Sequence, residues 1–503
     1  MSITEQMTEQ EIKDFLSKVN EDEPVADLFE TPIETNKKSN KKKKKAAGDF
    51  ASDIHYTDMG NALRLVILHS RDIRYSHEAK KWFIWDKKRW KQDNTGQVKR
   101  LAKATIKAMY KEAANIEDDD AREALIKHAL KSESDNRIKA MLSLAESEPG
   151  IPITLDQFDA DPFLLNCLNG TIDLRTGELR KHQREDYITK LAPVNYDPDA
   201  KSEIWERFLR RVLPDPENRA FVQRFAGYSA TGDTGEEKLA FPYGPPATGK
   251  TTFLRAVATP LGDYAATADF EAFLANKNQG GPRNDIARLA GKRFVISVEV
   301  EEGKRLAEAL VNQLTGGDTV SARFLYQESF EFVPQFKLWL AANNRPRITG
   351  TDGAIWRRIL QIPFNVQIPE NERDPKLKAI LCDTKKTGPA ILAWLVRGCL
   401  AWQREGLNPP MAVLQTTEEY KAEMDPLVEF IEDCCIISAR AQAKNPDLWE
   451  AYTTWCKNNG EKYPLGRKKF AQALFAKGLD QYHDGKDRVW IGIGLTTNTS
   501  NRF

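Results

Sequence analysis

Hydrophobic and polar positions recur with two periods along the chain, and turn residues mark where one period gives way to the other. Apolar residues at helical spacing run through 98–147 and 203–230, and Pro-Asp-Pro at 214–216 divides the second stretch into two amphipathic helices. Aromatic and charged residues alternate in FIWDKKRWKQD, which predicts a hairpin that turns at 86–89. The stretch LLNCLNGTIDLRTGELRKH predicts two short strands around a turn at 175–177.

Short apolar runs in the middle of the chain predict buried strands. They occupy 239–243, 292–302 and 335–344, and a further run follows 357–358. Because amphipathic stretches lie between them, we expect a parallel sheet with helices packed on it. Residues 316–332 alternate around Gln-Glu-Ser at 327–329 and predict a hairpin.

Composition divides this α/β multidomain chain into segments of different character. We assign 1–50 to a disordered acidic and lysine-rich tail, 51–200 to a mixed α/β N-terminal domain, 201–232 to a helical collar, 233–370 to the central core, 371–425 to a helical segment and 426–503 to a C-terminal winged helix. The lysine run of the tail has three interpretations: a solvated tail, a nonspecific hold on nucleic-acid phosphates, or a nuclear import signal.

Charge and cysteine content narrow the class of protein. With a net charge of +1 over 503 residues, any polyanion must be bound by a local patch or by rings of basic side chains. The six cysteines form no CxxC and no Cys/His cluster, which indicates a reduced intracellular compartment and no zinc site. The N-terminus is polar and the longest apolar run, 389–402, contains Arg397, so we expect a cytoplasmic protein without a signal peptide or a transmembrane helix.

The strongest motif is Gly244-x4-Gly249-Lys250-Thr251, placed between a strand-like run and an amphipathic stretch. Glycines permit positive φ and let backbone N–H groups face a phosphate, and the helix that starts near Lys250 would direct its positive end at the same phosphates. Lys250 would reach the β- and γ-phosphates, and the Thr251 hydroxyl would bind Mg²⁺. The motif predicts ATP and Mg²⁺ as cofactors, held by Gly244, Ala247, Thr248, Gly249, Lys250, Thr251 and Thr252.

Polar residues at the ends of the next two strands are candidates to complete this site. Glu299 stands at the end of the run 292–302, where a carboxylate would help to bind Mg²⁺, and Glu301 lies two residues on, on the same side of an extended chain. Which of the two is the base stays open. Asn343, at the end of the next strand, could hydrogen-bond the attacking water and the γ-phosphate, although asparagine also simply caps strands.

Arg357 and Arg358 precede the last apolar run. A guanidinium placed against the γ-phosphate of a neighbouring subunit would stabilise the charge of the transition state, and either arginine could serve. The alternative is an ordinary surface salt bridge.

Several of these stretches occur in a familiar order: LLNCLNGTIDLRTGELR, GYSATGDT, YGPPATGKTTFL, EVEEGKRLAEALVNQLTGGDTVSARFLY and FKLWLAANNRPRITGTDGAIWRRI. Together they resemble the phage and plasmid replicative helicases of superfamily 3, the helicase parts of primase–helicases that are related to the poxvirus NTPase. The resemblance implies an AAA+-type P-loop ring ATPase, usually a homo-hexamer, that moves 3′ to 5′ on single-stranded and forked DNA. It implies Walker A roles for Lys250 and Thr251, Walker B for Glu299, the sensor for Asn343 and the finger for Arg357 or Arg358.

The chain departs from the family pattern in two ways. Thr248 and Thr251 stand where Asn and Ser are usual, and both changes should keep the phosphate function. Only about 50 residues precede the match, so we expect no primase domain in this chain and a separate primase or initiator protein as a partner.

The family resemblance also assigns DNA contacts to the hairpin at 316–332, which supplies the loop that grips the strand in the central pore. Arg323, Tyr326 and Lys337 are the basic and aromatic candidates here. The alternative is a hairpin that only packs on the sheet.

The C-terminal segment predicts two helices, NPDLWEAYTTWCKNNG and GRKKFAQALFAKG, followed by a hairpin that turns at Asp484-Gly485. This order is typical of a winged helix. Arg467, Lys468 and Lys469 begin the second helix and are candidates for DNA contact, the alternative being a module that contacts protein.

These observations together predict an ATP-hydrolysing DNA helicase for replication of a phage or mobile element in a bacterial host. Two alternatives remain: a bifunctional primase–helicase, and an ATP-switched DNA-binding initiator that does not unwind. A carboxylate at the metal, Glu299, argues against the second, because a site that only binds nucleotide has no use for it.

Overall fold

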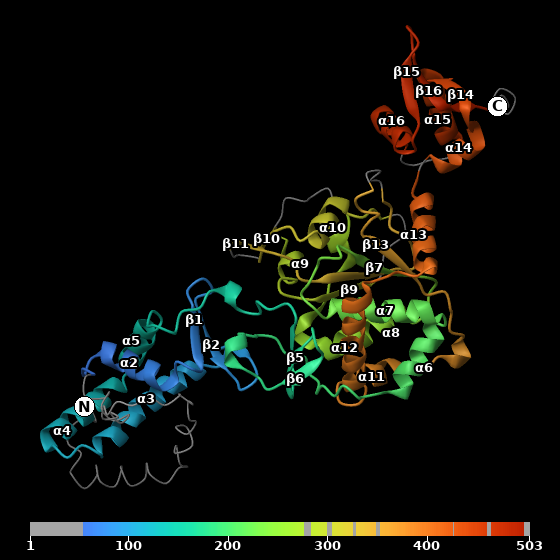
Figure 1. Cartoon of the computed structure of the whole chain (residues 1–503). Coiled ribbons are helices and arrows are strands. Elements are labelled where there is room, and N and C mark those ends of the chain that lie inside the picture. Colours follow the sequence, from blue (N-terminus) through green and yellow to red (C-terminus); the bar gives the residue numbers. More distant parts are fainter. Residues whose placement is uncertain are drawn as a thin grey trace, which may run out of the picture. The chain divides into compact units, whose positions relative to one another are not determined.

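The computed structural model of the chain describes residues 54–275, 283–298, 304–324, 328–348, 353–425, 427–459 and 464–496 (Figure 1). The chain divides into two compact units. One comprises Met1–Ala160 with Gln183–Thr189, and the other comprises Asp161–His182 with Lys190–Phe503. The tail predicted over 1–50 lies outside the described residues.

The first unit combines helices with a small antiparallel sheet. Its helices are α2 (Asp58–His69), α3 (Gln97–Ala113), α4 (Asp119–Ser132) and α5 (Asp135–Ala145), and its strands, in spatial order, are β1 (Ile73–Ser76), β2 (Lys81–Trp85) and β3 (Trp90–Gln92). Side-chain oxygens of Thr57, Asp118 and Ser134 accept backbone N–H groups at the starts of α2, α4 and α5, which fixes where these helices begin. The predicted hairpin and the helical spacing over 98–147 are confirmed.

Residues 183–189 belong to the first unit because they enclose Trp90. This side chain is fully buried, and its indole N–H donates to the Arg184 carbonyl at 2.8 Å. The backbone N–H of Trp90 donates to the Ile188 carbonyl at 2.8 Å. Tyr187 stacks on the indole with ring centroids 5.9 Å apart.

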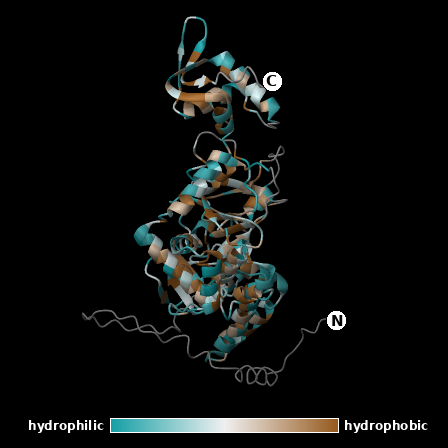
Figure 2. Cartoon of the chain, turned by 90° about the vertical axis from the view of Figure 1, so that its right-hand side faces the viewer, coloured by the Kyte–Doolittle hydropathy of each residue, from teal (hydrophilic) through white to brown (hydrophobic). Residues whose placement is uncertain are grey.

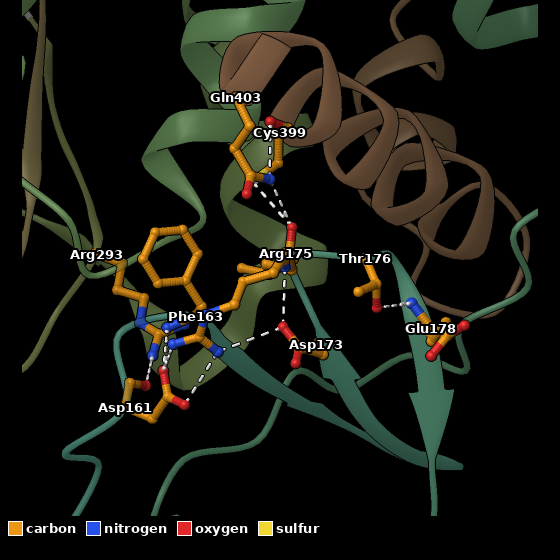
Figure 3. Close-up of polar contacts among 10 residues, drawn as sticks. Asp161, Phe163, Asp173, Arg175, Thr176, Glu178, Arg293, Cys399 and Gln403 are labelled. Carbon is orange, nitrogen blue, oxygen red and sulfur yellow. Dashed lines mark hydrogen bonds and ion pairs between the residues drawn. The ribbon is translucent and has the colours of Figure 1, made fainter.

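Residues 161–182 belong to the second unit instead, where they form β4 (Leu164–Cys167), β5 (Gly170–Asp173) and β6 (Glu178–Arg180). Leu165 and Ile172 are buried in the same core as Trp205. The amide of Gln403 donates to the Leu174 carbonyl at 2.8 Å, close to the paired side chains of Asp161 and Arg175 (Figure 3). The compact units therefore divide the chain differently from the predicted domain boundary at residue 200, since apolar alternation does not reveal which core a strand enters.

A parallel sheet forms the centre of the second unit (Figure 1). Its strands, in spatial order, are β13 (Ile359–Pro363), β7 (Leu239–Tyr243), β12 (Lys337–Ala341), β9 (Phe294–Val298) and β8 (Ala265–Thr267). Successive side chains point to opposite faces, so Phe294 and Ile296 enter one core and Val295 enters another. The predicted α/β architecture with a parallel sheet is confirmed.

Helices cover both faces of this sheet. The first core is shared with α6 (Glu203–Val212), α7 (Pro216–Ser229), α8 (Lys250–Leu261), α11 (Leu377–Leu381) and α12 (Gly388–Glu405). The second core is shared with α9 (Asn284–Ala287), α10 (Glu308–Thr315), α13 (Met411–Glu423) and the antiparallel hairpin of β10 (Val320–Arg323) and β11 (Ser329–Phe332). The predicted division of 203–230 into two helices is confirmed, as is the predicted strand pairing in 316–332.

Two glycines let α7 and α12 approach each other closely. A Cβ on Gly227 would lie 2.1 Å from the backbone nitrogen of Cys399, and a Cβ on Gly398 would lie 2.1 Å from the Gln223 carbonyl oxygen. Neither position can accept a larger residue unless the helices separate.

The C-terminal module, residues 427–496, has a core of its own around Tyr452, Phe470 and Trp490. It contains α14 (Val428–Cys434), β14 (Cys435–Lys444), α15 (Asn445–Asn458), α16 (Arg467–Ala476), β15 (Asp480–His483) and β16 (Arg488–Leu495), with sheet order β14-β16-β15. The two predicted helices and the predicted hairpin are present, whereas β14 was not predicted.

In the described residues, none of the helices is both long enough and apolar enough to cross a bilayer. Hydrophobic stretches of the ribbon are interrupted by hydrophilic ones throughout (Figure 2).

Candidate functional site

The loop between β7 and α8 takes its shape from its two glycines. A Cβ on Gly244 would lie 2.1 Å from the Phe364 carbonyl oxygen. Gly249 has φ of 86°, and a Cβ there would lie 2.6 Å from Val212 Cγ1. Ala247 also has positive φ, 61°, so the loop curls tightly and turns its backbone inward. The glycines predicted for the phosphate loop are therefore required by the local packing.

Lys250 is the first residue of α8, and its side chain lies inside this loop. Its ammonium donates to the carbonyls of Gly244 at 2.7 Å and Pro245 at 2.9 Å, and to the Thr248 hydroxyl at 3.1 Å. Burial lowers the pKa of Lys250 to about 8. No side chain caps the start of α8, so the N–H groups of its first turn can receive an anion.

A cavity of about 230 Å³ lies between this loop and the tips of two strands. The sheet side is formed by Val298 at the end of β9 and by Ala341, Ala342 and Asn343 at the end of β12. The loop side is formed by Pro246, Ala247, Thr248, Gly249, Lys250, Thr251 and Thr252. The structure thus brings Asn343 to the loop, as its strand-end position suggested.

Two acidic residues were also predicted for this site. Glu299 and Glu301 are outside the described residues, while Val298, which precedes them, lines the cavity. Thr251 lines the same cavity as Val298 and Asn343. Within the described ranges, no group of three or more His, Cys, Asp or Glu side chains could hold a metal ion.

The two candidate arginines differ in their surroundings. Arg358 pairs with Glu237 at 3.0 Å and donates to the Thr315 hydroxyl and the Ala354 carbonyl, each at 3.1 Å. These contacts are all within the chain, and the Arg358 side chain is 12% exposed, so its ion pair with Glu237 is more buried than an ordinary surface salt bridge. Arg357 is exposed.

Lys337 corrects one predicted DNA contact. Its side chain is 2% exposed, and its ammonium donates to the carbonyls of Thr231 at 2.6 Å and Asp233 at 2.8 Å. The ammonium also lies 4.6 Å from the centre of the Tyr228 ring. Burial lowers the pKa of Lys337 well below its usual value. The prediction that Lys337 contacts DNA is wrong, because the side chain binds the segment that precedes β7.

The other predicted DNA contacts have different outcomes. Arg323 is exposed in β10, opposite Ser329 of β11. Tyr326 lies outside the described residues. Arg467, Lys468 and Lys469 are all exposed in the first turn of α16.

Sequence reasoning missed the apolar wall of the cavity. Val298, Ala341 and Ala342 carry no chemical group that would mark them, and only their position at the carboxyl ends of parallel strands could have indicated them. Fold and site together define a multidomain α/β protein with a lysine-bearing loop at the carboxyl edge of a parallel sheet.

Three parts of the chain match models of known families. The chain matches the model "D5 N terminal like" over residues 62–214, a family of unknown function over 243–358 and the model "Poxvirus D5 protein-like" over 422–488. The two D5 matches and the viral relatives support the resemblance to the phage and viral superfamily 3 helicase–primase family that the motifs carry.

Curated relatives come from large DNA viruses. A putative helicase of Acanthamoeba polyphaga mimivirus is 27% identical over 334 residues, which cover 61% of this chain and 34% of that protein. A putative helicase of Invertebrate iridescent virus 3 is 28% identical over 357 residues, covering 63% and 38%. A putative primase of African swine fever virus is 22% identical over 329 residues, covering 61% and 34%. The chain thus spans little more than a third of the length of these relatives.

A solved structure, the apo A form of the NrS-1 C-terminal region, is 12% identical with a TM-score of 0.48, and the similarity covers 86% of this chain and 98% of that chain.

Proposed function

We propose that the chain is an ATP-dependent DNA helicase whose nucleotide occupies the cavity between the Lys250 loop and the tips of β9 and β12. The observation that carries this proposal is the meeting of a lysine, an uncapped helix start and Asn343 in one cavity. The names of the mimivirus and iridescent virus relatives, both putative helicases, support it.

The loop suits a triphosphate for a specific chemical reason. The Lys250 ammonium already lies among oxygen atoms at 2.7–3.1 Å, and phosphate oxygens would take the place of these acceptors. Because Gly249 has no side chain, the loop can keep its positive φ there and pack closely against Val212. The cavity and its donors therefore fit ATP.

In this proposal each site residue has a separate role in ATP hydrolysis. Thr251 and Glu299 would hold Mg²⁺, which would supply positive charge to the phosphates. Asn343 orients the attacking water, and Glu299 or Glu301 accepts its proton. Arg357, the exposed arginine, would reach a neighbouring subunit of a ring.

DNA contact in this proposal is independent of base sequence. Arg323 would bind a phosphate from the exposed face of the β10–β11 hairpin. Arg467, Lys468 and Lys469 would bind phosphates at the start of α16, and the succession of α15, α16 and the β15–β16 hairpin supports a winged-helix interpretation.

Unwinding of forked DNA by the full chain with Mg²⁺ and ATP tests the proposal. The Lys250→Ala variant should lose ATP hydrolysis by at least about 100-fold, because one charged donor to the phosphates is removed. Lys421→Ala is the control, since Lys421 is exposed and pairs with Glu418 on its own helix.

Wild-type protein that hydrolyses no ATP, or a Lys250→Ala variant with wild-type turnover, would overturn the proposal. Hydrolysis without unwinding would favour the initiator instead. Incorporation of ribonucleotides on a template would indicate primer synthesis, which the name of the African swine fever virus relative raises.

A further inference from the structure

Arg345 joins several elements of the second unit near the tip of β12. Its guanidinium lies over the ring of Tyr243, 4.6 Å from the centroid, and over the ring of Tyr420, 5.3 Å from the centroid. Its Nε–H donates to the Gln361 side-chain oxygen at 3.0 Å, and its Nη1 donates to the Glu423 carboxylate. Two ring faces and two acceptors therefore fix a side chain that is 13% exposed.

One end of this arrangement lies at the nucleotide cavity. Asn343, which lines the cavity, is two residues before Arg345. Tyr243 is the last residue of β7 and directly precedes Gly244 of the phosphate loop. A shift of either strand tip therefore changes how the Arg345 guanidinium is held.

The other end leads to the C-terminal module. Glu423 is the last residue of α13. Two residues later, Asp425 pairs with the Lys477 ammonium at 2.5 Å. Lys477 directly follows α16, the helix that begins with Arg467. The end of α13 thus lies between two ion pairs, one to the edge of the nucleotide cavity and one to α16.

We propose that Arg345 is a positioning residue that couples the nucleotide cavity to α16 through Glu423 and Asp425. This coupling rests on the proposed function. A γ-phosphate that draws Asn343 toward it moves Arg345 against its partners, and the ion pairs at both sides of the α13 terminus pass the change to α16. Coupling between binding sites is reciprocal, so DNA changes nucleotide affinity by the same factor as nucleotide changes DNA affinity.

The test compares two ion pairs of matched exposure in the full chain. Glu423→Gln removes the carboxylate of the Arg345–Glu423 pair, whose side chains are 13% and 52% exposed. Glu405→Gln is the matched control and removes the carboxylate of the Arg224–Glu405 pair. The side chains of this pair are 11% and 49% exposed, and the pair joins α7 to the end of α12. Affinity for single-stranded DNA is measured by fluorescence anisotropy with a slowly hydrolysed ATP analogue and with ADP.

Wild-type protein should bind DNA with affinities that differ by about fivefold or more between the two nucleotides. Glu423→Gln should bring the ratio of the two DNA affinities to within about twofold of one, while its KM for ATP stays within about twofold of wild type. Glu405→Gln should keep the wild-type ratio. Nucleotide affinity measured with and without DNA should show the same loss.

Arg345→Lys serves as a second variant, because it keeps the charge but loses the planar fork and most of the ring contact. It should lose the same coupling, and its combination with Glu423→Gln should lose no more. A wild-type ratio near one, or variants that keep the wild-type ratio, would overturn the coupling. Helicase activity in the wild type would then leave the proposed function standing, whereas absence of ATP binding would remove both.

Discussion

Replacing Gly249 should disturb the loop between β7 and α8 in two ways, through its backbone conformation and through its packing. A residue with a side chain would have to adopt the positive φ of Gly249, and its Cβ would lie 2.6 Å from Val212 Cγ1. Gly249→Ala should reduce the free energy of unfolding by about 1–3 kcal/mol and weaken ATP binding at least about tenfold. Chemical denaturation and a fluorescent ATP analogue measure the two effects. Gly235→Ala, where the nearest atom to a Cβ is 3.4 Å away, should change neither; equal behaviour of the two variants would contradict the packing argument.

The proposed binding of ATP should depend on pH through the Lys250 ammonium. Its pKa is lowered from 10.5 to about 8, so between these values the unfolded chain holds the proton and the contribution of this lysine to stability rises with pH. Phosphates favour the charged form, so binding of ATP should take up about 0.9 proton at pH 9 and about 0.1 at pH 7.

Titration calorimetry in buffers of different ionisation enthalpy measures this uptake. Lys250→Arg is the control, because a guanidinium keeps its proton throughout this range. Equal uptake at both pH values would assign the proton to another group.

At this scale the sequence predicted which residues form the loop between β7 and α8, because glycine, lysine and hydroxyl side chains have few other reasons to occur at that spacing. The sequence could not show that the Lys337 side chain is buried. A lysine beside an apolar run has the same pattern whether its ammonium meets solvent or, as here, buried carbonyls of Thr231 and Asp233. Arg345 was missed because its ring partners are distant in sequence.

At the scale of elements, the crossing of α7 and α12 depends on Gly227 and Gly398. Adding a methyl group to either should reduce the free energy of unfolding by about 3 kcal/mol, because the nearest atoms belong to backbone that cannot rotate away. Thermal and denaturant unfolding of Gly398→Ala measure this. Gly235→Ala, whose Cβ would lie 3.4 Å from the nearest atom, should lie within about 0.5 kcal/mol of wild type. A Gly398→Ala variant as stable as this control would show that the helices move apart without cost.

Long helices and apolar strands were predictable from their period, whereas some short strands were not. β14 shows why. Only Cys435 and Ala443 of this strand are buried, and its pairing with β16 is irregular between Ile437 and Gln442. Such a segment has no alternation for a sequence pattern to reveal.

At the scale of the whole molecule, variants of Arg357 and Arg358 test whether neighbouring subunits of a ring share one site for ATP hydrolysis. Arg357→Ala should keep nucleotide binding and lose turnover by about 100-fold, whereas Arg358→Ala should mainly reduce stability, since Arg358 pairs with Glu237. Mixing Arg357→Ala with Lys250→Ala should restore part of the ATP hydrolysis, measured against each variant alone. If Arg358→Ala is the variant that complements Lys250→Ala, the assignment is reversed.

The division at 161, 183 and 190 makes the backbone pass three times between the two units. A protease that cuts one of these passages divides the chain into two peptides. Each cut leaves residues 161–182 or 183–189 packed in a unit formed mainly by the other peptide, so noncovalent contacts hold the halves together. Removing the first unit by truncation at residue 161 would also strand Tyr187 and Ile188 without the indole they enclose. A stable fragment of this chain therefore has to keep residues 161–182 with the second unit and residues 183–189 with the first.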